Sequence, residues 1–526
     1  MIMNQNTPIA DTGDVKKQYT VSHTLVNVYL TLMFSFFPLF LTEQYVHART
    51  DKFWLYLILT AVLIISVVFS SSMKRLGDKT PAKPKGFLQS LSSTDIMMLC
   101  FVGFAAISTV TSPHISDAFT GFKGRDNGLL LLTAYALMYF IITRNYRYKD
   151  YAFVGYLVVS SIVALLTVIN YFYIDPLNIF AGYGEDTIVD FGSTIGNKNI
   201  IAAFMCMFLP IAVGFFTVTE KRYMRILSGF AIIFAYPGIL CADSSSNILG
   251  LLVILPIMLI IYCRSYTYLK RFFGAMTILF ISGKLLHLFA ILVGNKNKGF
   301  EVFQQFLIYS PQMFIPIIIC GTIFLLLFLA GKNGEPKYPA KALQITFKVV
   351  FGVIIMVLLG SFFYYSVIDR ESDLGNYEKL LRFSDAWGTH RGFMWRVSFE
   401  EYGKFNLWQK LFGAGPDTAY YVLEPHFKEL AARFGDASTD CAHNELINYL
   451  LTQGVFGLAA YLGLAAATLV RGLKTARKEP LTLVFMGAVL CYLVQSTVNL
   501  YNPIVTPHFF IFLTLTEAIS RSTSTE

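Results

Sequence analysis

Long apolar runs separated by short polar segments form the dominant pattern along this chain. A helix needs roughly 20 mostly apolar residues to cross about 30 Å of hydrocarbon, and runs of this kind recur over most of the sequence. The pattern therefore predicts an all-α integral membrane protein with about 14 transmembrane helices. The predicted spans cover residues 24–42, 53–72, 95–112, 128–143, 151–173, 200–219, 227–240, 248–263, 272–294, 306–330, 349–367, 445–470, 481–500 and 504–519.

Lys and Arg residues divide the loops between these spans into two alternating sets. Each loop of one set carries at least three of these residues, and each short loop of the other carries at most two. Short loops that are rich in Lys and Arg remain in the cytoplasm, so we expect the first set and both chain termini on that side. The basic loops are 73–94, 144–150, 220–226, 264–271, 331–348 and 471–480.

This orientation divides the chain into five parts. Residues 1–23 form a cytoplasmic tail, 24–367 hold the first eleven spans, 368–444 form a large extracytoplasmic loop domain, 445–519 hold the last three spans, and 520–526 form a second cytoplasmic tail. Because no cleavable signal pattern precedes the first span, we expect it to stay as a signal anchor. The predicted location is the cytoplasmic (plasma) membrane, with the lipid bilayer as the first partner.

The polar segment 368–444 is too long for a structureless connection inside a compact fold. It has helical signals of its own, because 418–434 suits a helix that ends at Gly435. A second set of residues recurs at helical spacing and is predicted to share one helix face: Arg391, Trp395, Ser398 and Tyr402. We therefore expect a small helical domain here.

Composition excludes a soluble enzyme. Of the 526 residues, 55% are hydrophobic and only 14% are charged, whereas soluble proteins carry roughly 25% charged residues. The 48 Phe and 30 Tyr suit lipid contact and interfacial belts. The net charge of +9 follows the loops and does not indicate nucleic acid, and the seven Cys form no CxxC metal motif or disulfide framework.

His443 is the first candidate for chemistry. It lies just before the twelfth predicted span, so we expect it in the first turn of a helix at the outer interface. The positive end of the helix dipole disfavours imidazolium, which leaves a neutral imidazole able to accept a proton near neutral pH. The alternative is an interfacial His that only caps or packs at a helix start.

The spacing after His443 is specific. His443 and Asn444 are followed by nine residues, Gly454, two residues and Gly457. This resembles the signature of the O-antigen ligase superfamily, which includes O-antigen polymerase-like proteins: His, then Asn, Ser or Gln, nine residues, Gly, two residues, and Gly, Thr or Tyr. Small residues at Gly454 and Gly457 are expected to let a neighbouring helix approach closely and so fix where His443 projects.

Other segments resemble further elements of that family. They include the segment 192–199 ahead of an apolar run, the segment His390 to Trp395, and the turn Gly413-Ala414-Gly415-Pro416. One element departs, because a Ser-Arg pair at the outer end of a middle span is replaced by Asp243-Ser244. Any anion contact made by that pair is therefore in question.

The resemblance implies a GT-C type glycosyltransferase that acts outside the cytoplasmic membrane. Such an enzyme takes a glycan from an undecaprenyl diphosphate carrier and passes it to a hydroxyl of a glycan or lipid acceptor. A diphosphate favours Arg, whose planar fork stays charged. The implied catalytic residues are His443 and Arg391, and the implied substrate-binding residues are Arg125, Arg396, Trp395, Asn444, Asn197 and Asn199.

No cofactor or metal is expected, because the outward loops contain no DxD pair and Glu185 with Asp186 suits loop solvation. The sequence leaves ligase and polymerase open. Two alternatives from other classes are a lipid-linked glycan flippase or similar transporter, and a non-catalytic assembly scaffold. The intramembrane Lys284 is either functional or marks a broken helix.

Overall fold

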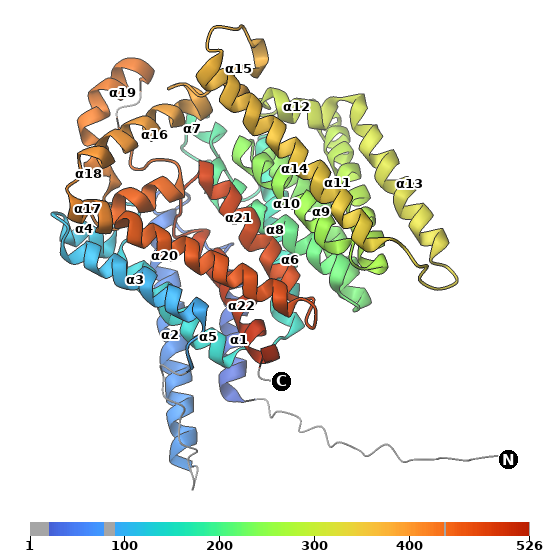
Figure 1. Cartoon of the computed structure of the whole chain (residues 1–526), viewed down its shortest axis with the longest axis horizontal. Coiled ribbons are helices and arrows are strands. Elements are labelled where there is room, and N and C mark those ends of the chain that lie inside the picture. The colour runs from blue at the N-terminus through green and yellow to red at the C-terminus, as the bar shows by residue number, and fades with distance from the viewer. Residues whose placement is uncertain (1–19, 78–89, 436–437, 525–526) are drawn as a thin grey trace.

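The computed structural model describes residues 20–77, 90–435 and 438–524 (Figure 1). Its regular structure is almost wholly helical, which confirms the predicted all-α class. The one sheet in the described residues pairs two short antiparallel strands, β1 (Phe191–Gly192) and β2 (Gly196–Asn197). Most of the predicted tail 1–23 lies outside the described residues.

Ten described helices are long and apolar enough to cross a membrane, in agreement with the predicted membrane protein. They are α2 (Ala48–Gly77), α3 (Ser93–Val110), α6 (Asp150–Tyr171), α8 (Lys198–Val218), α9 (Arg222–Cys241), α10 (Ser245–Tyr262), α11 (Tyr266–Leu292), α13 (Phe314–Ala330) with the preceding 3-10 turn η3 (Pro311–Met313), α14 (Ala340–Phe363) with the π-helical turn η4 (Tyr364–Ile368), and α20 (Glu445–Thr475).

The remaining predicted spans also coincide with helices. Three of these are shorter apolar helices, and the fourth is buried along most of its length. They are α1 (Val21–Thr31) with the π-helical turn η1 (Leu32–Phe36), α5 (Leu129–Asn145), α21 (Thr482–Gln495) and α22 (Thr506–Ser524).

The predicted span 306–330 is divided in two. A short helix, α12 (Val302–Tyr309), ends at Ser310, and the chain restarts at Pro311 because proline suits the first position of a helix. The Nζ of Lys284 donates to the carbonyls of Ile308 (2.9 Å) and Ser310 (2.6 Å) at this break. Helix α11 is continuous through Lys284. This lysine therefore does not interrupt its own helix, and its side chain donates to free carbonyls where the neighbouring segment is broken.

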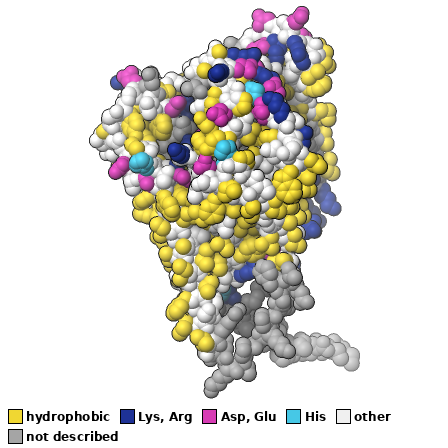
Figure 2. All heavy atoms as spheres, turned by 90° about the vertical axis from the view of Figure 1, so that its left-hand side faces the viewer, with side chains coloured by type: hydrophobic (Ala, Val, Ile, Leu, Met, Phe, Trp, Pro, Cys, Tyr) yellow, Lys and Arg dark blue, Asp and Glu magenta, His cyan; other side chains and the backbone are white. Residues whose placement is uncertain are grey.

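Helix burial separates a core from a periphery. Nearly every residue of α8 is buried, whereas α14 buries none. Figure 2 shows hydrophobic side chains covering much of the surface beneath an end where charged and His side chains gather. That end carries the helices of the segment 368–444, as the same vertical direction in Figure 1 shows.

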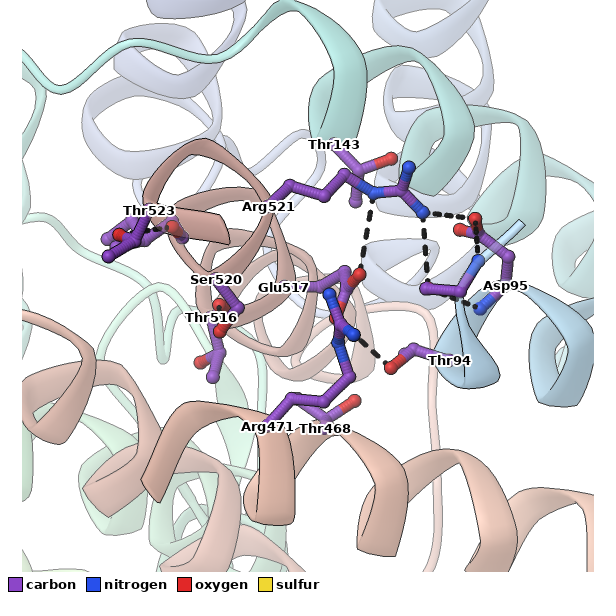
Figure 3. Close-up of polar contacts among 12 residues, drawn as sticks. Thr94, Asp95, Thr143, Thr468, Arg471, Thr516, Glu517, Ser520, Arg521 and Thr523 are labelled. Atoms are coloured by element: carbon purple, nitrogen blue, oxygen red, sulfur yellow. Dashed lines mark hydrogen bonds and ion pairs between the residues drawn. The ribbon is translucent and has the colours of Figure 1, made fainter. Parts of the chain in front are cut away.

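A buried ion-pair network ties four helices together at the other end of the bundle (Figure 3). Glu517 of α22 is fully buried and accepts from Arg471 of α20 at 2.7 Å, while Arg521 lies 3.4 Å away. Arg521 also pairs with the fully buried Asp95 of α3, which Arg144 of α5 contacts at 3.2 Å. The network therefore fixes the ends of α3, α5, α20 and α22 relative to one another.

Replacing Glu517 with Ala should strongly destabilise the protein. The change leaves Arg471 and Arg521 without their shared carboxylate, and breaking a buried pair costs about 3–5 kcal/mol. The matched control is Glu220→Ala, which removes the exposed partner of Arg271 and should cost at most about 1 kcal/mol. The free energy of unfolding in detergent is measured for both variants. A decrease in Glu517→Ala no larger than the decrease in Glu220→Ala would show that the network is not important for stability.

Candidate active site

The segment 368–444 folds onto the start of α20 as a set of short helices. They are η5 (Gly375–Tyr377), α15 (Glu378–Leu381), α16 (Trp387–Lys404), α17 (Leu407–Phe412), α18 (Ala419–Leu423), η6 (Glu424–His426) and α19 (Phe427–Phe434). Their small apolar core includes Phe393, Val397 and Leu430, and it also takes Ile447 and Leu451 from α20.

The helix predicted over 418–434 is wrong in its continuity and correct at its end. It is divided into α18, η6 and α19, with Pro425 in the 3-10 turn between the two α-helices. A proline lacks the N–H that a continuous helix would use. Gly435 ends α19 with a φ of 81°, in the left-handed region that favours glycine.

The two glycine motifs identified in the sequence pack against each other. Gly454 interrupts α20 with a φ of 67° and a ψ of −170°. The break frees two carbonyls of α20: Leu451 accepts from the N–H of Ala414 (3.0 Å), and Thr452 accepts from the N–H of Gly415 (2.9 Å). The turn 413–415 is therefore held on the kink by backbone hydrogen bonds.

Close backbone approach explains the glycines at this joint. A Cβ on Gly454 would lie 2.3 Å from the carbonyl oxygen of Leu411, and a Cβ on Gly413 would lie 2.2 Å from the carbonyl carbon of Thr452. Gly457 differs from the expectation, because its Cβ would meet Gln453 of its own helix at 2.3 Å. Gly454 thus admits a neighbouring segment, whereas Gly457 makes room for a side chain of α20.

Asp417, two residues after this turn, organises the loop before α5. Its carboxylate accepts from the backbone N–H of Phe122 (3.0 Å) and Asn127 (3.1 Å) and from Nε of Arg125 (2.8 Å). Both Asp417 and Arg125 are almost fully buried. The carboxylate therefore closes the loop 121–128 and aims the guanidinium of Arg125.

Arg125 connects Asp417 to Asp440. Its Nη1 lies 2.9 Å from Oδ2 of Asp440, and Nη1 of Arg49 lies 4.0 Å from the same oxygen. Burial opposes a charge on Asp440, but the attraction of Arg125 outweighs it and lowers the pKa of Asp440 well below its ordinary value. In the described structure Arg125 pairs with these two carboxylates and not with its sequence neighbour Asp126, which accepts from Thr50 at 2.7 Å.

His443 lies next to this charged group and just outside α20. Asn444 takes the N-cap position, and its side chain accepts from the N–H of Leu446 (2.9 Å) and Ile447 (3.1 Å). The prediction that His443 lies in the first helical turn is therefore wrong by two residues, because the helix begins at Glu445 and the cap residue precedes it. His443 itself has a φ of 47°, an uncommon left-handed conformation for a residue with a side chain.

The imidazole of His443 is neutral at neutral pH. Desolvation and the nearby charge of Arg391 lower its pKa to about 4, and the opposing charge of Asp440 is too weak to reverse the shift. The expected neutral state is confirmed in direction. Its physical cause is burial beside a cation, rather than the helix dipole alone.

Arg391 supplies a charge that no carboxylate pairs with among the described residues. Its Nη1 donates to the carbonyl of Gly388 at 2.6 Å, and its buried Nε has no hydrogen-bond partner in the described structure. Three residues with positive φ, Gly388 to His390, precede it and kink α16 near its start. A neutral imidazole and an unpaired guanidinium are thus near each other.

Three clustered side chains raise the question of a metal. The ligand atoms of Asp440, Cys441 and His443 all lie within 4.8 Å of one another. Without a metal, burial and the charge of Asp440 raise the pKa of the Cys441 thiol to about 12, so a metal ion would have to displace a tightly held proton. Metal ligands must be deprotonated, and Arg125 already pairs with Asp440. The adjacent Arg391 adds a further positive charge, so this group suits an anion better than a cation.

The other predicted binding residues have structural partners. Asn197 caps α8 by accepting from the N–H of Asn199 (2.9 Å), and the side chain of Asn199 accepts from Ser244 (2.9 Å). Arg396 pairs with three carboxylates of the loop domain: Asp385 (3.0 Å), Glu400 (2.7 Å) and Glu429 (3.2 Å). We call Arg49, Arg125, Arg391, Asp417 and Asp440 the group around His443. None of the contacts of Asn197, Asn199 or Arg396 reaches this group, whereas Asn444 directly follows His443.

Trp395 joins an aromatic cluster near Arg391. Its ring lies 5.2 Å from that of Trp387 and 6.1 Å from that of Phe383, between centroids. Its buried indole N–H has no hydrogen-bond partner among the described residues. Glu185 is exposed at the start of α7 (Glu185–Val189), as expected of a solvated loop residue, and the side chain of Asp186 lies outside the described part.

Asp243, which stands where the resemblance expects a Ser-Arg pair, borders a small cavity with Lys198 and Lys298. Burial raises the pKa of the Asp243 carboxyl to about 6. The Nζ of Lys298 donates to the carbonyls of Ile188 and Phe191, at 2.5 Å each. Lysine from another segment therefore supplies positive charge near this position.

Three residues of the group around His443 were missed as candidates: Arg49, Asp417 and Asp440. Asp417 follows the Gly413 to Pro416 turn directly, and Asp440 precedes His443 by three residues, so proximity to both motifs was an available signal. Arg49 carried none, because only the fold brings the start of α2 to this end of α20. Searches of protein-family models and of curated proteins found no match to the chain.

Replacing Asp417 with Ala should open the loop 121–128. The backbone N–H groups of Phe122 and Asn127 lose their acceptor, so hydrogen–deuterium exchange over this loop should become much faster. The control Asp126→Asn lies in the same loop and leaves those hydrogen bonds intact, and it should keep the wild-type rate. Unchanged exchange in Asp417→Ala would show that the carboxylate does not hold the loop.

Proposed function

We propose that this chain is a membrane glycosyltransferase that transfers a glycan from an undecaprenyl diphosphate carrier to an acceptor hydroxyl, as an O-antigen ligase or a related polymerase does. The observation that carries the proposal is a neutral imidazole, His443, whose pKa is lowered by the nearby charge of Arg391, a guanidinium that has no carboxylate partner among the described residues. A base for the acceptor and a cation for the diphosphate are the two groups that this reaction needs.

In the proposed reaction, His443 accepts the proton of the acceptor hydroxyl while its oxygen attacks the anomeric carbon. The bond from that carbon to the diphosphate oxygen breaks, and the diphosphate leaves with the electron pair. Arg391 stabilises the leaving charge, and Asp440 stabilises the imidazolium that forms. Solvent then takes the proton from His443, which restores the neutral base.

Other residues take supporting roles in this proposal. Arg125 positions Asp440, because it joins that carboxylate to the buried Asp417. Trp395 lies four residues after Arg391, and Asn444 directly follows His443; both are proposed to contact the donor or acceptor. Asn197, Asn199 and Arg396 are proposed to act on substrate only through the segments that they hold in place.

We propose about 14 spans, both termini in the cytoplasm, and a site on the outer face of the cytoplasmic membrane beneath an extracytoplasmic domain at 368–444. The distribution of Lys and Arg among the loops supports this orientation. A further support is the apolar surface below the charged end in Figure 2. The carrier lipid would then reach His443 from the outer leaflet.

His443→Ala should abolish transfer in proteoliposomes that contain a lipid diphosphate-linked oligosaccharide and an acceptor. General-base catalysis contributes about 100- to 10,000-fold, and donor binding should be nearly unchanged because the base acts on the acceptor. The control His426→Ala removes a histidine that pairs with Glu401 in the loop domain and should retain most activity. Full activity in His443→Ala would refute the mechanism, and movement of unreacted donor across the bilayer would indicate a flippase.

The rate of transfer should depend on pH through the base. Because the pKa of His443 is lowered to about 4, its neutral form predominates above that pH. Activity should therefore rise as pH increases through about 4 and should stay level from pH 6 to 8, and EDTA should have little effect. A plateau that begins only above pH 7, or a loss with EDTA that magnesium reverses, would contradict this assignment.

Arg391→Lys should lower transfer severely while expression stays normal. Lysine keeps the charge but loses the planar fork that binds two phosphate oxygens at once. The control Arg433→Lys changes an exposed arginine that pairs with Asp385 and should stay near wild type. Comparing the donor KM and kcat of both variants measures the effect, and wild-type turnover in Arg391→Lys would make the residue structural.

A further inference from the structure

A basic cavity lies at the end of α20 that is opposite to His443. Four residues line it: Arg264, which follows α10, Leu473 and Lys474 in the last turn of α20, and Arg477 just after that helix. The cavity measures about 310 Å³, and three of its four lining residues carry a positive charge while none is acidic. Leu473 and the three cations are exposed at its surface.

The position of these residues matches a membrane surface. After the kink at Gly454, α20 continues as a helix over residues 455–475, which at 1.5 Å per residue spans about 32 Å, close to the roughly 30 Å thickness of the hydrocarbon core. Lys474 therefore lies near or beyond the hydrocarbon boundary on the side away from His443. Arg264 comes two residues after α10, which is itself long and apolar enough to cross.

These cations differ from their basic neighbours at the same end of the bundle. The fold pairs Arg471 with Glu517, Arg271 with Glu220, and Lys221 with Asp150. Arg264, Lys474 and Arg477 make no ion pair in the described part of the chain. Three cations without an acidic partner around one cavity create a positive potential that favours an anion.

We propose that this cavity binds the phosphate headgroup of an anionic phospholipid from the leaflet opposite to the active site. Two arginines offer planar forks for phosphate oxygens, and basic pockets between membrane helices are suited to such headgroups. The acyl chains would lie along Leu473 and the exposed Val470 of α20. This proposal does not rest on the proposed transferase activity.

Lipid retention tests the proposal directly. The wild-type chain is reconstituted with phosphatidylglycerol, extracted into mild detergent and analysed by native mass spectrometry. The test variant is Arg264→Gln with Lys474→Gln and Arg477→Gln. The matched control removes three exposed cations of the same end that do not line the cavity: Lys74→Gln with Arg222→Gln and Lys332→Gln.

We expect the wild type and the control to retain a phosphatidylglycerol adduct, and the test variant to lose it at least tenfold. Phosphatidylcholine of the same chain length should not be retained. Equal retention by the test variant, or an equal loss in the control, would overturn the site. Displacement of the adduct by millimolar inorganic phosphate would also overturn it, since the site would then take a soluble anion. A melting temperature near wild type for the test variant confirms that it is folded.

Discussion

The buried guanidinium of Arg125 joins the two chain segments that carry Asp417 and Asp440. It donates to Asp417 from the turn after α17 and reaches Asp440 from the segment before α20. A charge buried this deeply is costly unless it is paired, so the loop before α5, the turn and the segment before α20 are constrained to one arrangement. The position of Asp440, and of His443 beside it, follows from that constraint.

Apolar patterning predicted most of the fold. Every predicted span coincides with a described helix, because a run of apolar residues in a membrane must satisfy its backbone internally. The patterning failed where a short-range signal competed with it. Pro311 divides the predicted span 306–330, and Pro425 divides the predicted helix 418–434. Both prolines stand inside otherwise apolar or helical stretches, and a single proline changes such a periodic pattern little.

The candidate site was less predictable, because its residues meet only through tertiary contacts. His443 and Arg391 lie within motifs that are visible in the sequence, and the fold brings them close enough for the charge of Arg391 to lower the pKa of His443. The partners of Arg125 come from positions roughly 290 and 315 residues away in sequence, so no local pattern could reveal them. Asn197 and Asn199 also stood within a motif, yet the described contacts make them part of the α8 cap rather than of the group around His443.

The kink at Gly454 also fixes the length of the first part of α20. The first part of α20 runs from its N-cap, Asn444, to this kink. Its start is held by the cap, and its end is held by the backbone hydrogen bonds to the turn 413–415. Each residue of a helix adds 1.5 Å of rise and a rotation of about 100°. Inserting or deleting one residue between 445 and 453 would therefore turn the imidazole away from Arg391 while every side chain of the site remained present. The direction of the His443 imidazole therefore depends on there being nine residues between Asn444 and Gly454.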